Sequence, residues 1–591
     1  MGDSFLLSNG LLFGVLPLLT TIIFLPLVGG VVLALTPSAA AHGSAHKGGA
    51  FGLHTMIALG FSLATFLVSL VLLVGFDGAN TSMQFVEQAS WIPALGVEYL
   101  IGVDGISILL ILLTTFLMPI VFIASGSVQT KKRGYLFHML ALETAMLGTL
   151  LSLDIFLFYV FWELMLAPMY FIIGIWGGKR RIYATIKFVL YTVFGSLLML
   201  VAIFYVISTF AEQTGTTTFV LGEIVDKIVL SPQEQFWLFA AFALAFGIKV
   251  PIFPFHTWLP DAHVEAPTGG SVVLAGVLLK MGLYGFIRFA YPLFPEGAMH
   301  FAPYIATLAT IGIVYGALVA WAQHDIKKLV AYSSVSHLGY CVLGFVALNT
   351  MATTGSVYQM LNHGVSTGAL FLLVGVLYDR KHTREISAYG GLAGKVPVFA
   401  FLFLVFTLSS IALPLTNGFI GEFMILAGAY QSYPTLTLIS VSGVILGAVY
   451  MLTLYMKTMF GEFSEERNGD LSDVNGRELA TLLPLFVLVF LMGVYPKPFL
   501  NLIEPTIKDY VSAQQMRLVN PAGEDDDSQD LNYAGLDGSI VDEVTKEHLR
   551  EVRIITSQEP HEVQLLNERM QLTRNGVSVT INGEEAQGVV R

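Results

Sequence analysis

Two lysines lie within stretches that are otherwise apolar enough to cross a lipid bilayer. Lys249 lies in WLFAAFALAFGIKVPIFPF, and Lys280 lies in SVVLAGVLLKMGLYGFI. A lysine near the middle of a bilayer costs roughly 3 kcal/mol on insertion scales, so such residues usually face a protein interior or a water-filled path. Lys249 could instead extend its side chain to the interface, because Pro251 and Pro254 indicate a break nearby. Lys280 has apolar sequence on both sides, so this explanation fits it less well.

Four further titratable residues lie in comparable surroundings. Glu163 is near the middle of DIFLFYVFWELMLAPMYFIIG, and Glu422 follows the interruption PLTNG in an apolar stretch. His337 and His363 lie in YSSVSHLGY and YQMLNHGVSTGAL. Taken singly, each has a structural interpretation, as a protonated core carboxyl or a core histidine that hydrogen-bonds a neighbour. Glu143, in MLALETAMLG, is another buried acid that could be structural.

Together these residues have the composition that a proton relay requires. The proton affinity of a buried lysine depends on the distance to the nearest carboxylate, and histidine titrates near neutral pH and can connect such sites through water. Breaks in helices at membrane depth are tolerated where they line protein or a cavity, and their free carbonyls could hold that water. The sequence therefore predicts proton transfer along a chain of six side chains: Glu163, Lys249, Lys280, His337, His363 and Glu422.

The elements that position these groups are predicted to be transmembrane helices. The chain has 591 residues, of which 55% are hydrophobic and only 12% charged, with a mean hydropathy of +0.72. Soluble domains carry roughly 25% charged residues, and a helix needs about 20 apolar residues to cross the hydrocarbon core. Fourteen such stretches are predicted: 11–36, 53–76, 106–126, 133–152, 154–177, 183–210, 234–256, 266–290, 302–322, 326–348, 355–378, 397–430, 436–460 and 479–498. The fold class is thus an all-α polytopic membrane protein.

Basic residues in short loops predict the orientation. With fourteen spans, four basic clusters fall on one face, which should be cytoplasmic, and both termini then lie on the outer face. The first stretch lacks a basic start and reads as a retained span rather than a cleaved signal. The clusters are Lys131–Arg133, Lys179–Arg181, Lys327–Lys328, and Arg380, Lys381, Arg384 and Lys395.

The last 87 residues differ in composition from the rest. Residues 505–591 contain 16 acidic and 8 basic residues, so they supply −8 of the total net charge of −12. The acidic run Glu524–Asp527 is typical of a solvated linker. Residues 541–553 have a weak helical pattern, and residues 576–583 predict a short strand bounded by turns. No basic patch predicts nucleic-acid binding.

Several kinds of chemistry are disfavoured by missing motifs. There is no G-x-x-x-x-G-K-[ST] phosphate loop, and Gly390, Gly391 and Gly394 do not follow a strand as a dinucleotide fingerprint would. The single cysteine, Cys341, excludes an internal disulfide and a four-thiolate iron–sulfur or zinc site. Haem ligation by His337 and His363 is conceivable, but the motifs around them fit a relay better.

Three long motifs resemble a known family. FGIKVPIFPFHTWLPDAHVEAPTGGSVVLAGVLLKMGLYGFIRF, HDIKKLVAYSSVSHLGY and LPLTNGFIGEFMIL are similar to segments of the chain M subunits of NADH-quinone oxidoreductase, respiratory complex I. The resemblance is strongest over residues 90–500 and does not extend to the tail. Chains L and N and the Mrp-type sodium/proton antiporter subunits share the fold. Chain M is favoured because the last buried charge is a glutamate in Gly421-Glu422-Phe423, where chain L carries lysine.

The resemblance implies a core of ten helices in two inverted five-helix repeats. The repeats would be spans four to eight and nine to thirteen, with spans seven and twelve broken. The domains would be three N-terminal spans over 1–130, the core over 131–460 (repeats 131–290 and 302–460), a last span over 461–504 and the acidic tail over 505–591. Gly269 and Leu415 depart from the family pattern, which has alanine in PTAGS and glycine in LPGT.

The resemblance also implies a role for each relay residue. Glu163 and Lys249 would form an ion pair whose separation drives the cycle. Lys280 would be the central relay group, with His337 and His363 connecting it to the terminal group Glu422.

The implied assembly is a bacterial inner-membrane complex. This chain would be its non-redox translocase subunit, beside chain L-type and chain N-type subunits in the lipid bilayer. FMN, iron–sulfur clusters and quinone would belong to partner subunits, with no cofactor or metal on this chain; the loop His42–Gly49 is expected to be a connector. Three alternatives remain open: a sodium/proton antiporter-type subunit, a membrane scaffold that conducts nothing, and the membrane subunit of an energy-converting hydrogenase.

Overall fold

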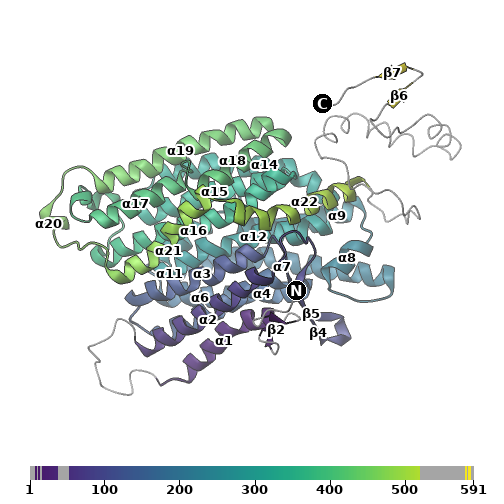
Figure 1. Ribbon diagram of the computed structural model, residues 1–591, viewed down its shortest axis with the longest axis horizontal. Helices are drawn as coiled ribbons and strands as arrows, with labels where there is room; N and C mark the ends of the chain where they lie inside the picture. Colours follow the sequence, from purple (N-terminus) through teal and green to yellow (C-terminus); the bar gives the residue numbers. More distant parts are fainter. Residues whose placement is uncertain are drawn as a thin grey trace. The chain divides into compact units, whose positions relative to one another are not determined.

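The computed structural model describes residues 7–8, 11–12, 16–37, 52–519, 579–581 and 584–586. The chain divides into two units, Met1–Gly523 and Glu524–Arg591. Figure 1 shows the first unit as a bundle of long helices. In the second unit, β6 (Val579–Ile581) pairs antiparallel with β7 (Glu584–Ala586), which places a strand within the predicted segment 576–583. The loop His42–Gly49 and the segment 541–553 lie outside the described residues.

The first unit contains short strands near its start and then helices almost throughout. The strands are β1 (Leu7–Ser8), β2 (Leu11–Leu12), β3 (Leu16–Pro17), β4 (Gln84–Ile92) and β5 (Val97–Val103). Helices of the first half are α1 (Leu18–Leu35), α2 (Leu53–Gly75), α3 (Ile108–Ala124), α4 (Lys132–Leu151), α5 (Ile155–Leu164), α6 (Leu166–Trp176), α7 (Arg181–Thr214), α8 (Leu221–Lys227), α9 (Pro232–Lys249), α10 (Trp258–Glu265), α11 (Thr268–Val273), α12 (Leu279–Gly285) and α13 (Tyr291–Leu293). Helices of the second half are α14 (Pro295–Trp321), α15 (Ile326–Val346), α16 (Thr350–Lys381), α17 (Pro397–Ser410), α18 (Asn417–Ser432), α19 (Pro434–Met459), α20 (Glu465–Asn468), α21 (Gly476–Val494) and α22 (Lys497–Val519).

Helices occupy every one of the predicted apolar stretches. In the described part of the chain, 12 helices are long and apolar enough to cross a membrane, which makes the chain a multi-pass membrane protein. The two predicted stretches without such a helix are 234–256 and 397–430. They contain α9, which is as long as α1 but less apolar than the counted helices, and the shorter helices α17 and α18. The total of fourteen spans and the inverted repeats therefore stay predictions.

Both expected helix breaks are present. α9 ends at Lys249, and the chain is irregular until α10 begins at Trp258; Pro251 and Pro254 lie in this gap, where they supply no N–H for a continuing helix. The second break separates α17 from α18 over residues 411–416. Leu415 has a φ of +77° in this break, the left-handed region that glycine adopts without a steric cost. Glycine, the residue that the resemblance leads us to expect here, would adopt this φ without strain.

The helix that carries Lys280 is irregular in a different way. Two five-residue π-helical segments, Leu274–Leu278 and Phe286–Ala290, interrupt it on either side of α12. π segments are rare and occur often at functional sites. Every residue from 269 to 291 is buried in the bundle. Lys280 therefore cannot extend its side chain to the lipid interface.

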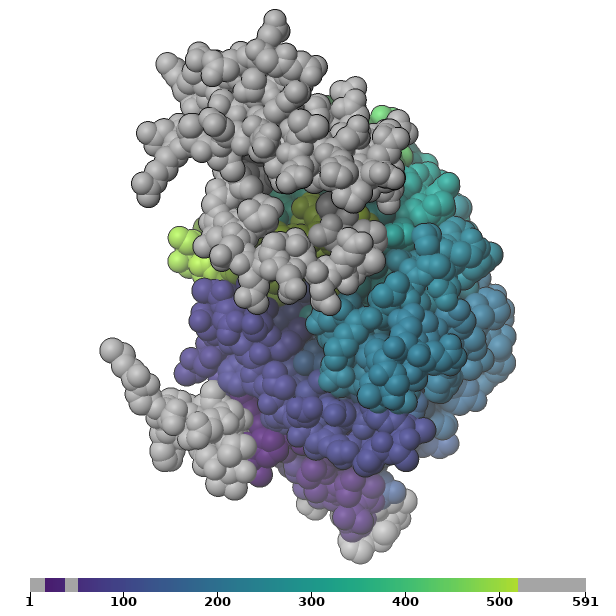
Figure 2. All heavy atoms as spheres, turned by 90° about the vertical axis from the view of Figure 1, so that its right-hand side faces the viewer, coloured from purple at the N-terminus to yellow at the C-terminus, as the bar shows by residue number. Residues whose placement is uncertain are grey.

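The bundle has two chemically different ends. The four basic clusters lie in the loops and in the adjoining helix ends at one end of the bundle, which we term the basic end. The antiparallel hairpin β4–β5 lies at the other, the hairpin end, on the right in Figure 1 and facing the viewer in Figure 2. Asp154 joins the hairpin to α5, because its carboxylate accepts hydrogen bonds from Glu98 N (3.0 Å) and Leu157 N (2.9 Å). Burial raises the pKa of Asp154 to about 6.

Helix α22 runs across the hairpin end and was not expected from the sequence. Thr506 Oγ1 accepts a hydrogen bond from Gly105 N (3.3 Å), and Arg517 pairs with Asp226 at 3.4 Å. Ile503, Ile507 and other apolar residues of α22 are buried against the bundle. Pro505 lies inside this helix, so the predicted tail boundary at residue 505 falls within a continuous helix.

Candidate functional site

Lys280 and His363 are in direct contact in the centre of the bundle. Lys280 Nζ lies 2.7 Å from His363 Nδ1 and also donates to the carbonyl of Ala275, five residues earlier on its own helix. Ala275 belongs to the π segment Leu274–Leu278. This segment thus supplies a backbone acceptor that holds the ammonium group beside His363, which comes from α16.

A small cavity separates His363 from His337 of α15. The two imidazole rings have their centroids 6.0 Å apart, too far for a direct hydrogen bond. The cavity is lined by both histidines and has a volume of about 10 Å³. This is about the smallest volume that can hold a water molecule. His363 Nε2 and Asn362 Oδ1, from two residues of its lining, have no hydrogen-bond partner in the structure. The chemistry of the lining fits a water that connects the two histidines.

His337 continues the line to Glu422 of α18. Its Nδ1 lies 2.9 Å from Glu422 Oε1, and Gln359 Nε2 donates to the same oxygen at 3.0 Å. On the other side of the ring, His337 Nε2 lies 3.3 Å from Ser410 Oγ and 3.4 Å from Tyr450 Oη. Glu422 lies in α18, just beyond the second helix break, so the break places this carboxyl group inside the bundle.

Four of the six predicted residues therefore form one group, while the other two are separate from it. Lys249 is buried, with its Nζ 5.0 Å from the centroid of the Trp162 ring. Glu163 is half-buried. Among the salt bridges of the described residues, none joins Glu163 to Lys249 within 4.0 Å. The ion pair that the resemblance implied is not closed in this structure.

Sequence reasoning missed the polar residues that complete this line. Gln359 binds Glu422, and Asn362 donates from Nδ2 to Gln359 Oε1 at 3.0 Å. Gln359 precedes His363 by four residues on α16, so the two share one face of the helix. That spacing is the signal that could have identified Gln359. Ser410 and Tyr450 come from α17 and α19 and have no sequence signal that links them to His337.

A second cavity, of about 570 Å³, opens at the basic end. Two cations from the second half of the chain contact the last carbonyls of α10: Lys327 Nζ donates to Ala266 O and Arg384 Nη1 to Val264 O, each at 2.6 Å. Cations are favoured at the negative end of a helix dipole. His263 of α10 is fully buried and stacks on Phe371 with ring centroids 4.5 Å apart. Among the described residues, neither of its ring nitrogens has a hydrogen-bond partner.

The described residues contain no group of three or more His, Cys, Asp or Glu side chains arranged to hold a metal ion. The buried titratable groups are instead arranged in a line, from Lys280 through His363 and His337 to Glu422. Proton transfer along hydrogen bonds is the chemistry that such a line supports.

Comparisons with known proteins agree on one family. The family model "NADH:quinone oxidoreductase/Mrp antiporter, TM" matches residues 152–447, and "NADH-ubiquinone oxidoreductase chain 4, amino terminus" matches residues 50–149. NADH-quinone oxidoreductase subunit M of Rhodobacter capsulatus is 48% identical over 504 residues, which cover 84% of this chain and 96% of the relative. The subunit M of Rickettsia conorii is 43% identical over 498 residues, covering 84% and 98%.

Solved structures show the same fold. A chain of respiratory complex I from Thermus thermophilus with bound NADH matches with a TM-score of 0.75 and 34% identity, covering 84% of this chain and 99% of that one. A chain of the Mrp complex from Dietzia sp. DQ12-45-1b matches with a TM-score of 0.70, 19% identity and coverage of 84% and 99%, a likeness of fold alone. The chain therefore belongs to the family of subunit M, or chain 4, of NADH-quinone oxidoreductase, the antiporter-like membrane subunits of respiratory complex I.

Proposed function

We propose that this chain carries protons across the membrane within a complex whose partner subunits transfer electrons from NADH to quinone. The observation that carries the proposal is the line from Lys280 Nζ to His363 Nδ1 (2.7 Å) and from His337 Nδ1 to Glu422 Oε1 (2.9 Å), with a water-sized cavity between the histidines. A complex I relative that is 48% identical to this chain supports the setting.

Protons enter from the basic end, which is the cytoplasmic face, and leave at the hairpin end, which is the outer face of the bacterial inner membrane. The chain termini then lie on that outer face. Glu163 and Lys249 are the input pair: when their separation changes, the charge near the line changes, and Lys280 gains or releases its proton. Glu422 is the terminal acceptor and exit group.

This chain holds no redox cofactor in the proposal. FMN, iron–sulfur clusters and the quinone belong to partner subunits, and antiporter-like subunits of the L and N types are its neighbours in the membrane. The relatives are named as subunits of an oxidoreductase, and one matched structure is respiratory complex I with bound NADH, which supports this division of labour.

The test uses the assembled complex in proteoliposomes. Lys280→Ala, Lys249→Ala and Glu163→Gln should each abolish most of the NADH-driven pH gradient and slow quinone reduction, because each removes a proton-holding group. Lys280→Arg should fail as well, since arginine does not deprotonate. Lys179→Ala, on an exposed loop at the basic end, is the matched control and should pump normally.

The outcomes separate the alternatives. Normal pumping in Lys280→Ala would contradict the proposal. If these variants assemble poorly but the complexes that do form pump normally, the result would favour a membrane scaffold that conducts nothing. If added sodium dissipates the pH gradient, the result would favour an antiporter-type subunit. If the chain copurifies with a hydrogenase in place of NADH-oxidising partners, it belongs to an energy-converting hydrogenase.

A further inference from the structure

The helix that carries Lys280 has two more polar side chains on the way to the hairpin end. Tyr284 follows Lys280 by four residues, and Arg288 follows Tyr284 by four. Residues at this spacing succeed one another along one face of a helix. A proton on Lys280 therefore has two possible directions: sideways to His363, or onward along its own helix toward Tyr284.

The onward direction ends at the Tyr284 hydroxyl group. Its Oη donates to the carbonyl of Leu150 (2.9 Å) and accepts from Arg288 Nε (3.2 Å). To pass a proton on, a hydroxyl must receive one and give its own to a group that can transfer it further. A backbone carbonyl does not hold a proton for onward transfer, and the guanidinium group has no acceptor site. The hydroxyl group is thus hydrogen-bonded on both sides to groups that cannot pass a proton on.

Arg288 also places a permanent positive charge at this point. Its Nη2 lies 2.6 Å from Asp104 Oδ1, and both side chains are buried. The same carboxylate oxygen accepts hydrogen bonds from Ile106 N (3.1 Å) and Ser107 N (3.0 Å) at the start of α3, so the acid is fixed by the backbone. Because this carboxylate is paired with the guanidinium group, the pair carries little net charge. Its contribution at this point is a guanidinium group that has no acceptor site and does not deprotonate.

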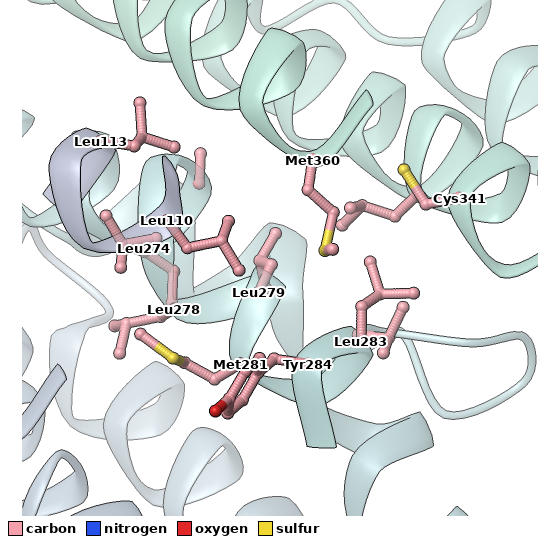
Figure 3. Packing of buried hydrophobic residues seen from close by; sticks show 14 of the residues in the cluster. Leu110, Leu113, Leu274, Leu278, Leu279, Met281, Leu283, Tyr284, Cys341 and Met360 are labelled. Carbon is pink, nitrogen blue, oxygen red and sulfur yellow. The ribbon is translucent and has the colours of Figure 1, made fainter. Parts of the chain in front are cut away.

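The surroundings of this pair are closed. Arg288 is 8% exposed and Asp104 is 1% exposed, and Figure 3 shows the apolar side chain of Met281 beside Tyr284. On the outer side, α22 lies against Gly105, the neighbour of Asp104: a Cβ atom added at Gly105 would lie 2.1 Å from Leu502 O. There is no space between this helix and the backbone that holds the acid.

We propose that Tyr284, Arg288 and Asp104 form a proton seal between Lys280 and the hairpin end. The seal leaves one transfer open to Lys280: an Nζ–H bond breaks, and an N–H bond forms at Nδ1 of His363. The inference rests on the proposed function, and adds that outward release occurs through Glu422 because the shorter route along α12 is closed. Without the seal, protons would reach Lys280 from both faces during the cycle and flow back down the gradient.

The deciding variant is Arg288→Lys in the complete complex reconstituted in proteoliposomes. A lysine keeps the charge and can pair with Asp104, but it deprotonates and can relay. The expected result is the loss of most of the NADH-driven pH gradient while quinone reduction continues, with faster decay of that gradient when NADH is exhausted. A purely structural ion pair would be rescued by lysine, so a normal gradient in this variant would overturn the seal.

The controls separate the seal from assembly and from the proposed function. Arg380→Lys alters a comparable pair, with Glu478 at 2.7 Å at the basic end, and should not leak. If Arg288→Lys does not assemble, Asp104→Asn decides the question: it keeps the backbone hydrogen bonds, loosens the guanidinium and should leak. The double variant Lys280→Ala/Arg288→Lys should lose the leak, measured as the decay of a pH gradient imposed on the proteoliposomes by a pH jump. A leak that persists would overturn the seal, whereas normal pumping in Lys280→Ala alone would overturn the proposed function.

Discussion

At the residue scale, the relay consists of charged groups and of neutral groups that position them. Glu422 Oε1 receives two hydrogen bonds, from His337 and Gln359. The two donors fix the carboxyl group in position inside the bundle. Gln359 thereby orients Glu422 toward His337, although it carries no proton of the relay itself.

Removing that amide should disturb the exit step. In Gln359→Leu, Glu422 loses a hydrogen bond of a kind that contributes about 1.5–3 kcal/mol to a charged group, so its carboxyl group is held less firmly beside His337. We expect a slower build-up of the pH gradient, measured with a pH-sensitive dye during NADH oxidation. Unchanged pumping would show that His337 alone sets the behaviour of Glu422.

The sequence identified the charged members of this group but not their partners. Lysine and glutamate at membrane depth are conspicuous because their insertion is costly. Ser410, Tyr450 and Gln359 carry no charge, so their presence in apolar helices does not mark them as members of the group. The open distance between Glu163 and Lys249 depends on side-chain rotamers and helix positions that no sequence pattern specifies.

At the element scale, the contact between Lys280 and His363 depends on how closely two helices approach. Gly276 lies in the π segment before Lys280, and Gly364 follows His363 on α16. A Cβ atom at Gly364 would lie 2.6 Å from Leu113 Cδ2 and 2.9 Å from Gly276 O. The leucine side chain can rotate away, but the backbone oxygen cannot move without moving the helix.

Gly364→Ala should therefore separate the two helices. We expect a loss of about 1–3 kcal/mol in the free energy of unfolding, as for other overpacked sites, and a clear loss of proton pumping. Gly368→Ala, one turn further along the same helix, would meet its nearest atoms only at 3.8 and 3.9 Å and should be tolerated. Thermal unfolding in detergent and the pH gradient measure the two effects; equal behaviour of both variants would contradict the role of the close approach.

The second helix break contains strain that a single substitution should relieve. Leu415 has a φ of +77° and is 66% exposed, so glycine would remove a steric cost of about 1–2 kcal/mol and lose little apolar contact. Leu415→Gly should raise the melting temperature of the purified complex. Leu413→Gly, in the same break but without a positive φ, should lower it. A lower melting temperature for Leu415→Gly would contradict this account.

The helices and their breaks were largely predictable, whereas α22 was not. Long apolar stretches and the prolines at 251 and 254 indicated spans and a break that the structure contains. The π segments around Lys280 leave no composition signal. Helix α22 is amphipathic, contains Pro505 and lies where the composition becomes acidic, so its sequence resembled the start of a solvated tail.

At the scale of the whole molecule, the relay, the seal and α22 all belong to the first unit, Met1–Gly523. The curated relatives match 84% of this chain and 96–98% of their own length. The part that the family shares is therefore sufficient for a complete subunit in those relatives.

A chain that ends at Gly523 should assemble and pump protons as the full chain does, because it keeps every group of the line and the helix that covers the hairpin end. Copurification of partner subunits and the NADH-driven pH gradient test this together. A chain that ends at Val494 is the matched comparison: without α22 it should assemble poorly, since Gly105 loses its neighbour. Failure of the longer variant, which ends at Gly523, would assign a required role to residues 524–591.

The cavity between His337 and His363 has a further consequence. A volume of about 10 Å³ holds one water molecule or none, so the connection between the two imidazoles is made or broken in a single discrete event. The two states differ by one molecule drawn from bulk solvent. Osmotic stress should therefore change the rate of this step only slightly, in proportion to the activity of water. The closing of a wide aqueous pore expels many water molecules and would respond far more steeply.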